Sequence, residues 1–186
     1  MNYLILLTGC GLGDGSAIEE AICTYISLDK YNINYTPIAE NIEKPSVNHY
    51  NNLESEYRNL LIESARIGRG KIANIKDIDI KEFDGLIIIG GLGIIKNTID
   101  SEELEDMINF FIESNKPVGA MCAAIDFLNR YYDMSSIKSI AKTLKQSEAY
   151  HDVNANIFYT PAFRAGANLF EIQKGIDEIV YLMISN

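Results

Sequence analysis

The chain has little positive charge and no long apolar run. Its 186 residues contain 16 Lys and Arg against 26 Asp and Glu, a formal net charge of −10 at neutral pH. Binding to a nucleic-acid backbone requires clustered positive charge, so we expect no nucleic-acid partner. No apolar run approaches the roughly 18 residues that a membrane helix needs, so no membrane partner is expected either.

Cysteine and histidine are also scarce. Cys10, Cys23 and Cys122 are an odd number without a metal-type spacing, and neither His49 nor His151 lies near them in the sequence. We therefore expect no metal and no cofactor, and a reducing, cytoplasmic compartment fits this cysteine usage. The apolar segment 1–8 lacks basic residues and a small-residue cleavage site, which predicts a first strand and not a signal peptide.

Three continuous apolar runs predict strands that are buried on both faces of a parallel sheet: Tyr3 to Thr8, Gly85 to Ile89 and Val118 to Met121. Each run ends in a turn of small residues, and helical patterns follow at Ser16 to Leu28 and at Ala123 to Tyr132. This alternation predicts an open α/β sheet in which all three turns lie at the carboxyl edge, where ligands bind in such folds.

With 47% apolar residues, the chain is expected to form one domain over residues 1–186. Asn51 to Gly70 and Ser101 to Ser114 fit helices, the second with Ser101 as N-cap. Ile157 to Thr160 predicts a strand, and Ile172 to Ile184 a terminal helix. Met134 to Asn156 gives no clear strand signal, and we expect a surface excursion there.

Cys122 is the strongest candidate for a functional residue. It stands between the strand Val118 to Met121 and the helical pattern that follows, with Ala120, Ala123 and Ala124 as small neighbours. This is the arrangement of a nucleophile elbow, in which a strained turn exposes the nucleophile and backbone amides stabilise negative charge. The alternative is a buried, inert cysteine at the end of a strand.

Several further blocks occur in a defined order along the chain. They are Gly9-Cys10-Gly11-Leu12-Gly13-Asp14-Gly15-Ser16, Glu56 to Gly70, Gly90-Gly91-Leu92-Gly93-Ile94-Ile95-Lys96-Asn97, Lys116 to Cys122 and Thr160-Pro161-Ala162. Together they resemble the ElbB family, named after isoprenoid biosynthesis and also called sigma cross-reacting proteins, within the PfpI and class I glutamine amidotransferase-like superfamily. The resemblance spans nearly the whole chain.

The resemblance implies a flavodoxin-like three-layer α/β/α sandwich in which Cys122 is the nucleophile. It implies an oxyanion hole made by the amide of Ala123 and by the Gly91-Leu92 turn. A turn rich in glycine lets backbone amides approach a ligand closely, which agrees with that role. The alternative is that this turn only connects a strand to a helix.

Two departures from the family pattern concern the partners of the thiol. Related amidotransferases and proteases place a histidine at or near the position after the nucleophile, where this chain has Ala123. The family pattern also has a glutamate where this chain has Ala17. Asp14 and Glu20 are the candidate replacements as catalytic acids, with Glu56 as a further carboxylate, although Asp14 equally fits an N-cap of the following helix.

Two residues are candidates for binding the substrate. Arg58 is a bidentate cation that suits a substrate carboxylate, and Asn97 ends the glycine-rich turn. Arg66 is an alternative to Arg58. The competing interpretation is that these arginines form a solvated ion-pair face with Glu63.

We therefore expect a glyoxalase-type enzyme that converts glyoxal or methylglyoxal to a hydroxy acid through Cys122 without a cofactor. The partner is then a small-molecule carbonyl substrate, and relatives suggest a homodimer. The alternatives are a non-catalytic redox or stress protein that oxidises Cys122, and an amidotransferase-like protein that has lost activity.

Overall fold

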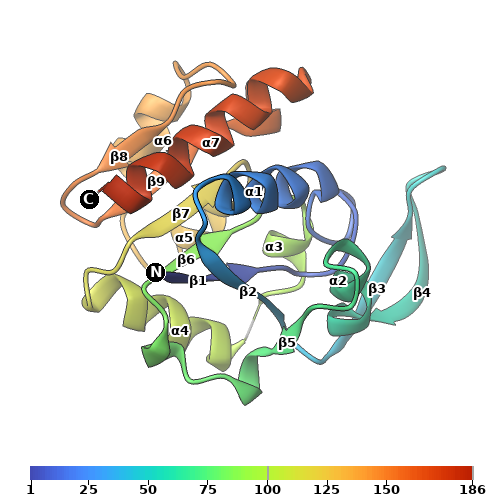
Figure 1. Ribbon diagram of the computed structural model, residues 1–186. Helices are drawn as coiled ribbons and strands as arrows, with labels where there is room; N and C mark the ends of the chain where they lie inside the picture. The colour runs from blue at the N-terminus through green and yellow to red at the C-terminus, as the bar shows by residue number, and fades with distance from the viewer. Residues whose placement is uncertain (100, 186) are drawn as a thin grey trace.

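A seven-stranded sheet forms the centre of the protein in a computed structural model, which describes residues 1–99 and 101–185 (Figure 1). The strand order is β5-β2-β1-β6-β7-β9-β8, and every neighbouring pair is parallel except β8 and β9. The strands are β1 (Asn2–Leu6), β2 (Asn34–Ala39), β5 (Ala73–Asn74), β6 (Gly85–Ile88), β7 (Val118–Met121), β8 (Tyr150–Asp152) and β9 (Ile157–Thr160).

Helices cover both faces of this sheet. The long helices α1 and α7 pack on each other over one face, and α4 lies on the other (Figure 1). The helices are α1 (Ile18–Lys30), α2 (Leu60–Ile67), α3 (Gly93–Lys96), α4 (Glu102–Glu113), α5 (Ala124–Leu128), α6 (Ser135–Ala141) and α7 (Leu169–Ser185), with short 3-10 turns η1 (Ile75–Asp77), η2 (Ile80–Glu82) and η3 (Ala162–Arg164). The predicted flavodoxin-like three-layer sandwich is confirmed.

The apolar runs in the sequence form the central strands because both faces of those strands are covered. Every residue of β6, β7 and β9 is buried, as are Tyr3 to Leu6 of β1. These side chains belong to one hydrophobic core that also includes the inner faces of α4 and α7. The predicted strands are therefore confirmed, with ends that differ by one or two residues.

The glycine-rich turns after β1 and β6 meet at the carboxyl edge of the sheet, as predicted. The Ala17 amide donates to the Gly90 carbonyl at 2.9 Å, and the Gly93 amide donates to the Gly15 carbonyl at 3.0 Å. Gly91 has a φ of +106°, and a Cβ there would lie 2.3 Å from the Gly15 carbonyl oxygen. Glycine at position 91 is therefore required for this close approach.

The predicted helix from Asn51 to Gly70 is wrong in its first half. Strands β3 (Glu43–Asn48) and β4 (Leu53–Asn59) form a separate antiparallel hairpin that projects beside α2 (Figure 1). Asn52 adopts a left-handed φ of 60° in the connecting turn, a conformation that asparagine tolerates. Leu53 and Tyr57 have helical spacing, but they lie exposed on this hairpin.

The segment Met134 to Asn156 is also more ordered than expected. It contains α6 and the edge strand β8, and it contributes Met134 and Ile137 to the core. His151 lies on β8, where its ring stacks on Phe158 with 3.9 Å between centroids. Ile137, Ile140, Ala141 and Leu144 have helical spacing, so the sequence did hold a signal for α6, whereas the three-residue strand β8 is too short to give one.

Ser101 caps α4, as its sequence predicts. Its hydroxyl accepts a hydrogen bond from the Leu104 amide at 3.2 Å and donates to Glu40 Oε1 at 2.6 Å. We expect Ser101→Ala to lower the free energy of unfolding by about 1 kcal/mol, measured by urea denaturation. Ser114→Ala at the other end of the helix is the control, and an equal loss in both variants would contradict the capping role.

Candidate active site

The elbow predicted at Cys122 is present. The residue follows β7 directly and has a φ of +51°, a left-handed conformation that is uncommon for a residue with a side chain. Its amide donates to the Thr160 carbonyl at 3.2 Å, which ties the turn to the end of β9. The residue is 9% exposed, so it lies at the edge of the core with limited access to solvent.

Two backbone amides donate hydrogen bonds to the sulfur of Cys122. They belong to Ala123 and Gly91, two of the residues expected to form an oxyanion hole, and both lower the pKa of the thiol. The third expected residue, Leu92, does not contribute, because its amide already donates to the Leu12 carbonyl at 2.8 Å. The glycine turn therefore approaches the thiol through Gly91.

Glu20 is the acidic residue beside the thiol. Its side chain is fully buried on α1, and Oε2 accepts a hydrogen bond from the Gly90 amide at 2.9 Å. The Cys122 thiol is close enough to this carboxyl to affect its pKa, and Oε1 accepts no hydrogen bond within residues 1–99 and 101–185. A Cβ at Gly90 would lie 2.5 Å from Glu20 Oε2 and 2.7 Å from Cys122 Cβ, so only glycine leaves room for this contact.

Glu20, one of the two candidate replacements for the family glutamate, thus lies beside the thiol. Ala17 is the N-cap of α1, and Glu20 follows within the first turn of the same helix. Residues three apart lie on neighbouring positions of a helix surface, which is why Glu20 reaches the region where the family pattern places its glutamate.

The electrostatics of the pair favour retention of a proton. Burial raises the pKa of Glu20 to about 7, against the hydrogen bonds from Gly90, Cys122 and Phe163. Burial, and then the charge of Glu20, raises the pKa of the Cys122 thiol to about 12, while the amides of Ala123 and Gly91 and the charge of Arg164 oppose this rise. At neutral pH the Glu20–Cys122 pair therefore keeps at least one proton. This proton can be on the Cys122 sulfur or on the Glu20 carboxylate.

Asp14 takes neither of its predicted roles. Its Oδ2 accepts a hydrogen bond from the Val47 amide at 2.5 Å, and its Oδ1 lies 3.6 Å from His49 Nε2. Helix α1 starts instead at Ala17 without a side-chain cap. Asp14 thus holds the hairpin β3–β4 against the turn after β1, which explains an acidic residue there without catalysis.

The predicted substrate-binding side chains, Arg58 and Asn97, are occupied elsewhere. The buried Asn97 amide donates to the carbonyls of Thr8 and Asp14, at 3.0 and 2.6 Å, and so fixes the turn after β1. Arg58 lies on the hairpin and pairs with Glu56, with Glu63 3.8 Å away.

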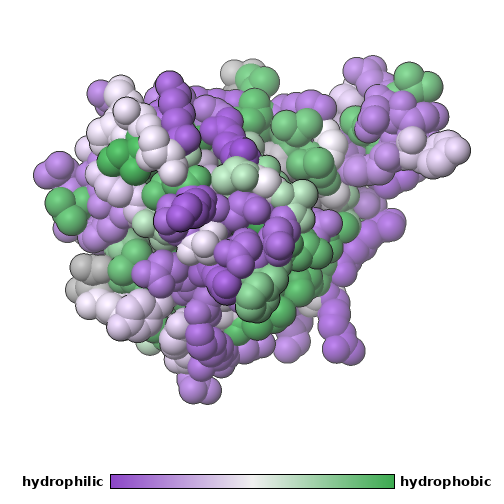
Figure 2. All heavy atoms as spheres, turned by 90° about the horizontal axis from the view of Figure 1, so that it is seen from above, coloured by the Kyte–Doolittle hydropathy of each residue, from purple (hydrophilic) through white to green (hydrophobic). Residues whose placement is uncertain are grey.

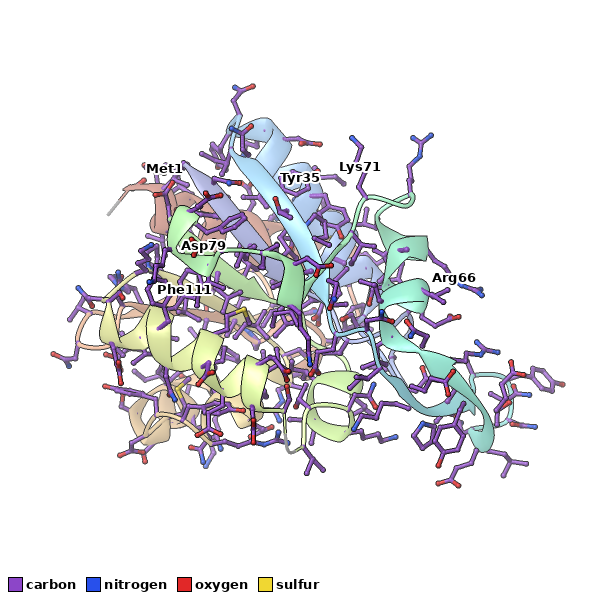
Figure 3. The ribbon with its side chains drawn as sticks, turned by 90° about the horizontal axis from the view of Figure 1, so that it is seen from below. Met1, Tyr35, Arg66, Lys71, Asp79 and Phe111 are labelled. Carbon is purple, nitrogen blue, oxygen red and sulfur yellow. The ribbon has the colours of Figure 1, made fainter. Side chains whose placement is uncertain are left out.

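Arg66, the alternative to Arg58, pairs with Glu63 at 3.1 Å on α2. It points away from the body of the protein (Figure 3). Both arginines thus belong to an exposed ion-pair face, which was the competing interpretation.

Two residues that sequence reasoning missed lie beside the elbow. The Tyr159 hydroxyl donates to the Cys122 carbonyl at 3.3 Å, and Arg164 is close enough for its charge to lower the pKa of the thiol. Arg164 also forms an ion pair with Asp126. The signal in the sequence was the Thr160-Pro161-Ala162 block, which places the following 3-10 turn at the same edge of the sheet.

Neither histidine contacts Cys122. His49 accepts a hydrogen bond from the Gly13 amide at 3.1 Å, and His151 lies within 3.1 Å of Asn156 Oδ1. Within residues 1–99 and 101–185, no group of three potential ligands is arranged to hold a metal ion. No helix of that described part is long and apolar enough to cross a membrane.

The other two cysteines are half-buried, and all three are free. Cys10 lines a small cavity with Arg58 and Glu63, next to the hairpin. Cys23 packs against the core from α1, although its neighbours Ile22 and Ile26 are exposed.

Comparison with known proteins gives consistent matches. Residues 71–153 match the DJ-1/PfpI family. A crystal structure of an isoprenoid biosynthesis protein with an amidotransferase-like domain from Ehrlichia chaffeensis is 30% identical and superposes with a TM-score of 0.87, over 100% of this chain and 98% of the other. A ThiJ/PfpI domain protein from Brachyspira murdochii is 13% identical with a TM-score of 0.59 over 100% and 96%, a likeness of fold alone.

Curated relatives are similar over a shorter region. The human glutamine amidotransferase-like class 1 domain-containing protein 3, mitochondrial, is 32% identical over 133 residues, which cover 64% of this chain and 50% of that protein. The ES1 protein homolog, mitochondrial, from Rattus norvegicus gives the same identity and the same coverage. The match therefore spans about half the length of these relatives.

The raised pKa of Glu20 predicts a pH dependence of stability. Between about pH 4.5, where an unfolded glutamate titrates, and about pH 7, the folded protein holds one more proton than the unfolded chain. The free energy of unfolding should therefore fall as the pH rises through this window. In Glu20→Gln this decrease in the free energy of unfolding should be smaller by up to about 3 kcal/mol.

The measurement is chemical denaturation of wild type and Glu20→Gln at several pH values. Glu19→Gln, at an exposed position on the same helix, is the control. Parallel stability curves for wild type and Glu20→Gln would show that Glu20 titrates normally in the folded protein, against this account.

Proposed function

Because the chain belongs to the DJ-1/PfpI family, and within it to the ElbB-like proteins of the class I glutamine amidotransferase-like superfamily, we propose that it is a cofactor-independent glyoxalase. Its substrate is then methylglyoxal or glyoxal, and its nucleophile is Cys122. The observation that carries the proposal is the buried Glu20 carboxyl beside the Cys122 thiol, which also accepts hydrogen bonds from the backbone amides of Gly91 and Ala123.

The reaction begins with addition of the thiol to the aldehyde. Cys122 Sγ bonds to the aldehyde carbon while the thiol proton passes to the Glu20 carboxylate. Glu20 then returns this proton to the new alkoxide oxygen, which gives a hemithioacetal. The Gly91 and Ala123 amides stabilise negative charge on sulfur and on the adjacent oxygen during this step.

An internal redox step and a hydrolysis complete the reaction. Glu20 removes the hydrogen on the former aldehyde carbon as a proton, and the resulting enediolate is reprotonated on the neighbouring carbon. The aldehyde carbon is thereby oxidised to a thioester and the ketone is reduced to an alcohol, so no external oxidant is needed. Water then cleaves the thioester, which releases the hydroxy acid and the free thiol.

A glutamate with a pKa near 7 suits these transfers, because it accepts and donates protons with similar ease at neutral pH. A glutaminase would need the Cys-His pair of its relatives, and both histidines of this chain are engaged away from Cys122. Glutaminase activity therefore has little support. Oxidation of Cys122 in a stress protein is the second candidate, favoured by the two amides that would stabilise a sulfinate.

We also propose that the protein is a homodimer. Ile18, Ile22 and Ile26 are spaced by four residues on α1 and are 42%, 39% and 53% exposed, so they form one apolar stripe. Figure 2 views the face that carries α1 and α7, where hydrophobic side chains interrupt a largely hydrophilic surface.

A cytoplasmic location remains a prediction, since the names of the curated relatives place those proteins in mitochondria.

Methylglyoxal turnover tests the proposed reaction. We expect wild type to produce lactate and Cys122→Ser to lose about a hundredfold or more of kcat/KM, because a serine hydroxyl is far less acidic and a far weaker nucleophile than a thiol. Glu20→Gln should lose at least about a hundredfold, since it removes the proton carrier. Cys23→Ser is the control for a cysteine outside the site. Equal lactate formation by wild type and Cys122→Ser would remove the glyoxalase proposal in favour of the redox alternative.

Light scattering after size-exclusion chromatography tests the dimer. Ile22→Glu places a charge in the middle of the stripe and should convert the dimer to a monomer, because burial of an unpaired carboxylate is unfavourable. Val153→Glu, at an exposed apolar residue in the turn between β8 and β9, should leave the mass unchanged. A wild-type monomer, or a dimer in both variants, would rule out this interface.

A further inference from the structure

A second feature of the molecule lies next to the elbow and has no role in the steps above. It is an open cavity of about 600 Å³ between α5, α6 and the 3-10 turn η3. Apolar atoms from Ile125 and Leu144 line part of it. The remaining lining includes the charged side chains of Asp126, Lys138, Lys142 and Arg164.

The charge of this cavity differs from that of the rest of the protein. Three cationic side chains and one carboxylate line it, in a chain whose net charge is −10. Asp126 is shared by two of the cations: Lys138 Nζ lies 3.2 Å from its Oδ1, and Arg164 pairs with its Oδ2. The side chain of Lys142 forms no ion pair or hydrogen bond within residues 1–99 and 101–185, and only its backbone amide is bonded, to the Ile140 carbonyl. The cavity therefore keeps an excess of positive charge that the protein itself does not neutralise.

This arrangement differs from a solvated surface lysine in two ways. Asp126 holds Arg164 and Lys138 on the wall of one concave space, so the entropy of positioning these two cations has already been lost before a ligand arrives. Concave walls of low dielectric also strengthen attraction to an anion. Repulsion among the three cations is relieved when an anion binds between them.

The cavity is connected to the reacting thiol by two side chains. Tyr159 lines the cavity and donates its hydroxyl to the Cys122 carbonyl at 3.3 Å. Arg164 lines the cavity and also acts electrostatically on the Cys122 sulfur. Arg164 is thus near both the thiol and the cavity, which places the cavity beside the reacting end of a substrate.

We propose that this cation-lined cavity is a subsite for an anionic group on the substrate, so that the preferred substrate is an α-oxoaldehyde carrying a phosphate or a carboxylate. The proposal rests on the proposed function for the reacting end of the molecule. Arg164 is assigned to the anionic group through its planar guanidinium, and Lys142 supplies the free charge. The covalent steps are those given above, with water as the other reactant and a phosphorylated or dicarboxylic hydroxy acid as the product.

Three substrates distinguish the source of the anion. Methylglyoxal is neutral, hydroxypyruvaldehyde phosphate carries a phosphate, and dioxovalerate carries a carboxylate. We expect wild type to show a higher kcat/KM for at least one of the anionic compounds than for methylglyoxal. We define the preference ratio as kcat/KM for the anionic substrate divided by kcat/KM for methylglyoxal. Lys142→Gln should lower this ratio by about tenfold, because one charge-assisted hydrogen bond typically changes affinity by about that factor.

The matched control is Lys145→Gln, because Lys145 follows closely in the sequence, is 81% exposed and does not line the cavity. The ratio should be the same in this variant as in wild type. Thermal unfolding of each variant checks that the fold is retained. A ratio that does not change in Lys142→Gln, or a wild-type preference for methylglyoxal, overturns the anionic subsite while it leaves the glyoxalase proposal intact.

Binding of inorganic phosphate, measured by calorimetry on the same three proteins, separates the two proposals. Saturable binding that is about tenfold weaker in Lys142→Gln than in Lys145→Gln supports the subsite even if no α-oxoaldehyde is converted. In that case the proposed reaction fails and the anion site stands. Absence of phosphate binding together with turnover of methylglyoxal alone overturns the subsite.

Discussion

The left-handed backbone of Cys122 is the constraint on which the rest of the site depends. This conformation turns the sulfur away from β7 and toward the amides of Gly91 and Ala123 and the carboxyl of Glu20. Position 90 must be glycine, because a Cβ there would collide with both Glu20 and Cys122. The glycines that look like flexible turn residues in the sequence are therefore required by close packing.

Shared protonation follows from this packing. Two acidic groups lie together with little solvent, so burial raises the pKa of both, and the charge of Glu20 raises the pKa of the thiol further. The pair therefore holds a proton under conditions in which an exposed glutamate would have lost it. Arg164 offsets part of this repulsion and also forms the wall of the adjacent cavity, so one cation links the chemistry at the thiol with the selection of a substrate.

Much of this could be predicted from the sequence, for identifiable reasons. The runs at Gly85 and Val118 are continuous because both faces of those strands are buried, and Ser101 marks a helix start because few residues cap as well. The hairpin around Asn52 was missed because Leu53 and Tyr57 imitate a helical spacing while they lie exposed.

The site was harder to predict than the fold. Asp14 and Glu20 were both candidates for the catalytic acid, and only the tertiary structure shows that Asp14 contacts the hairpin while Glu20 lies beside the thiol.

The thiolate absorbance of Cys122, titrated in a Cys10→Ser, Cys23→Ser background with and without Glu20→Gln, tests the central claim most directly. This account predicts a thiol pKa far above the ordinary value with Glu20 present, and a clearly lower value with glutamine, because the neighbouring charge is removed. The same pKa in both proteins would contradict it.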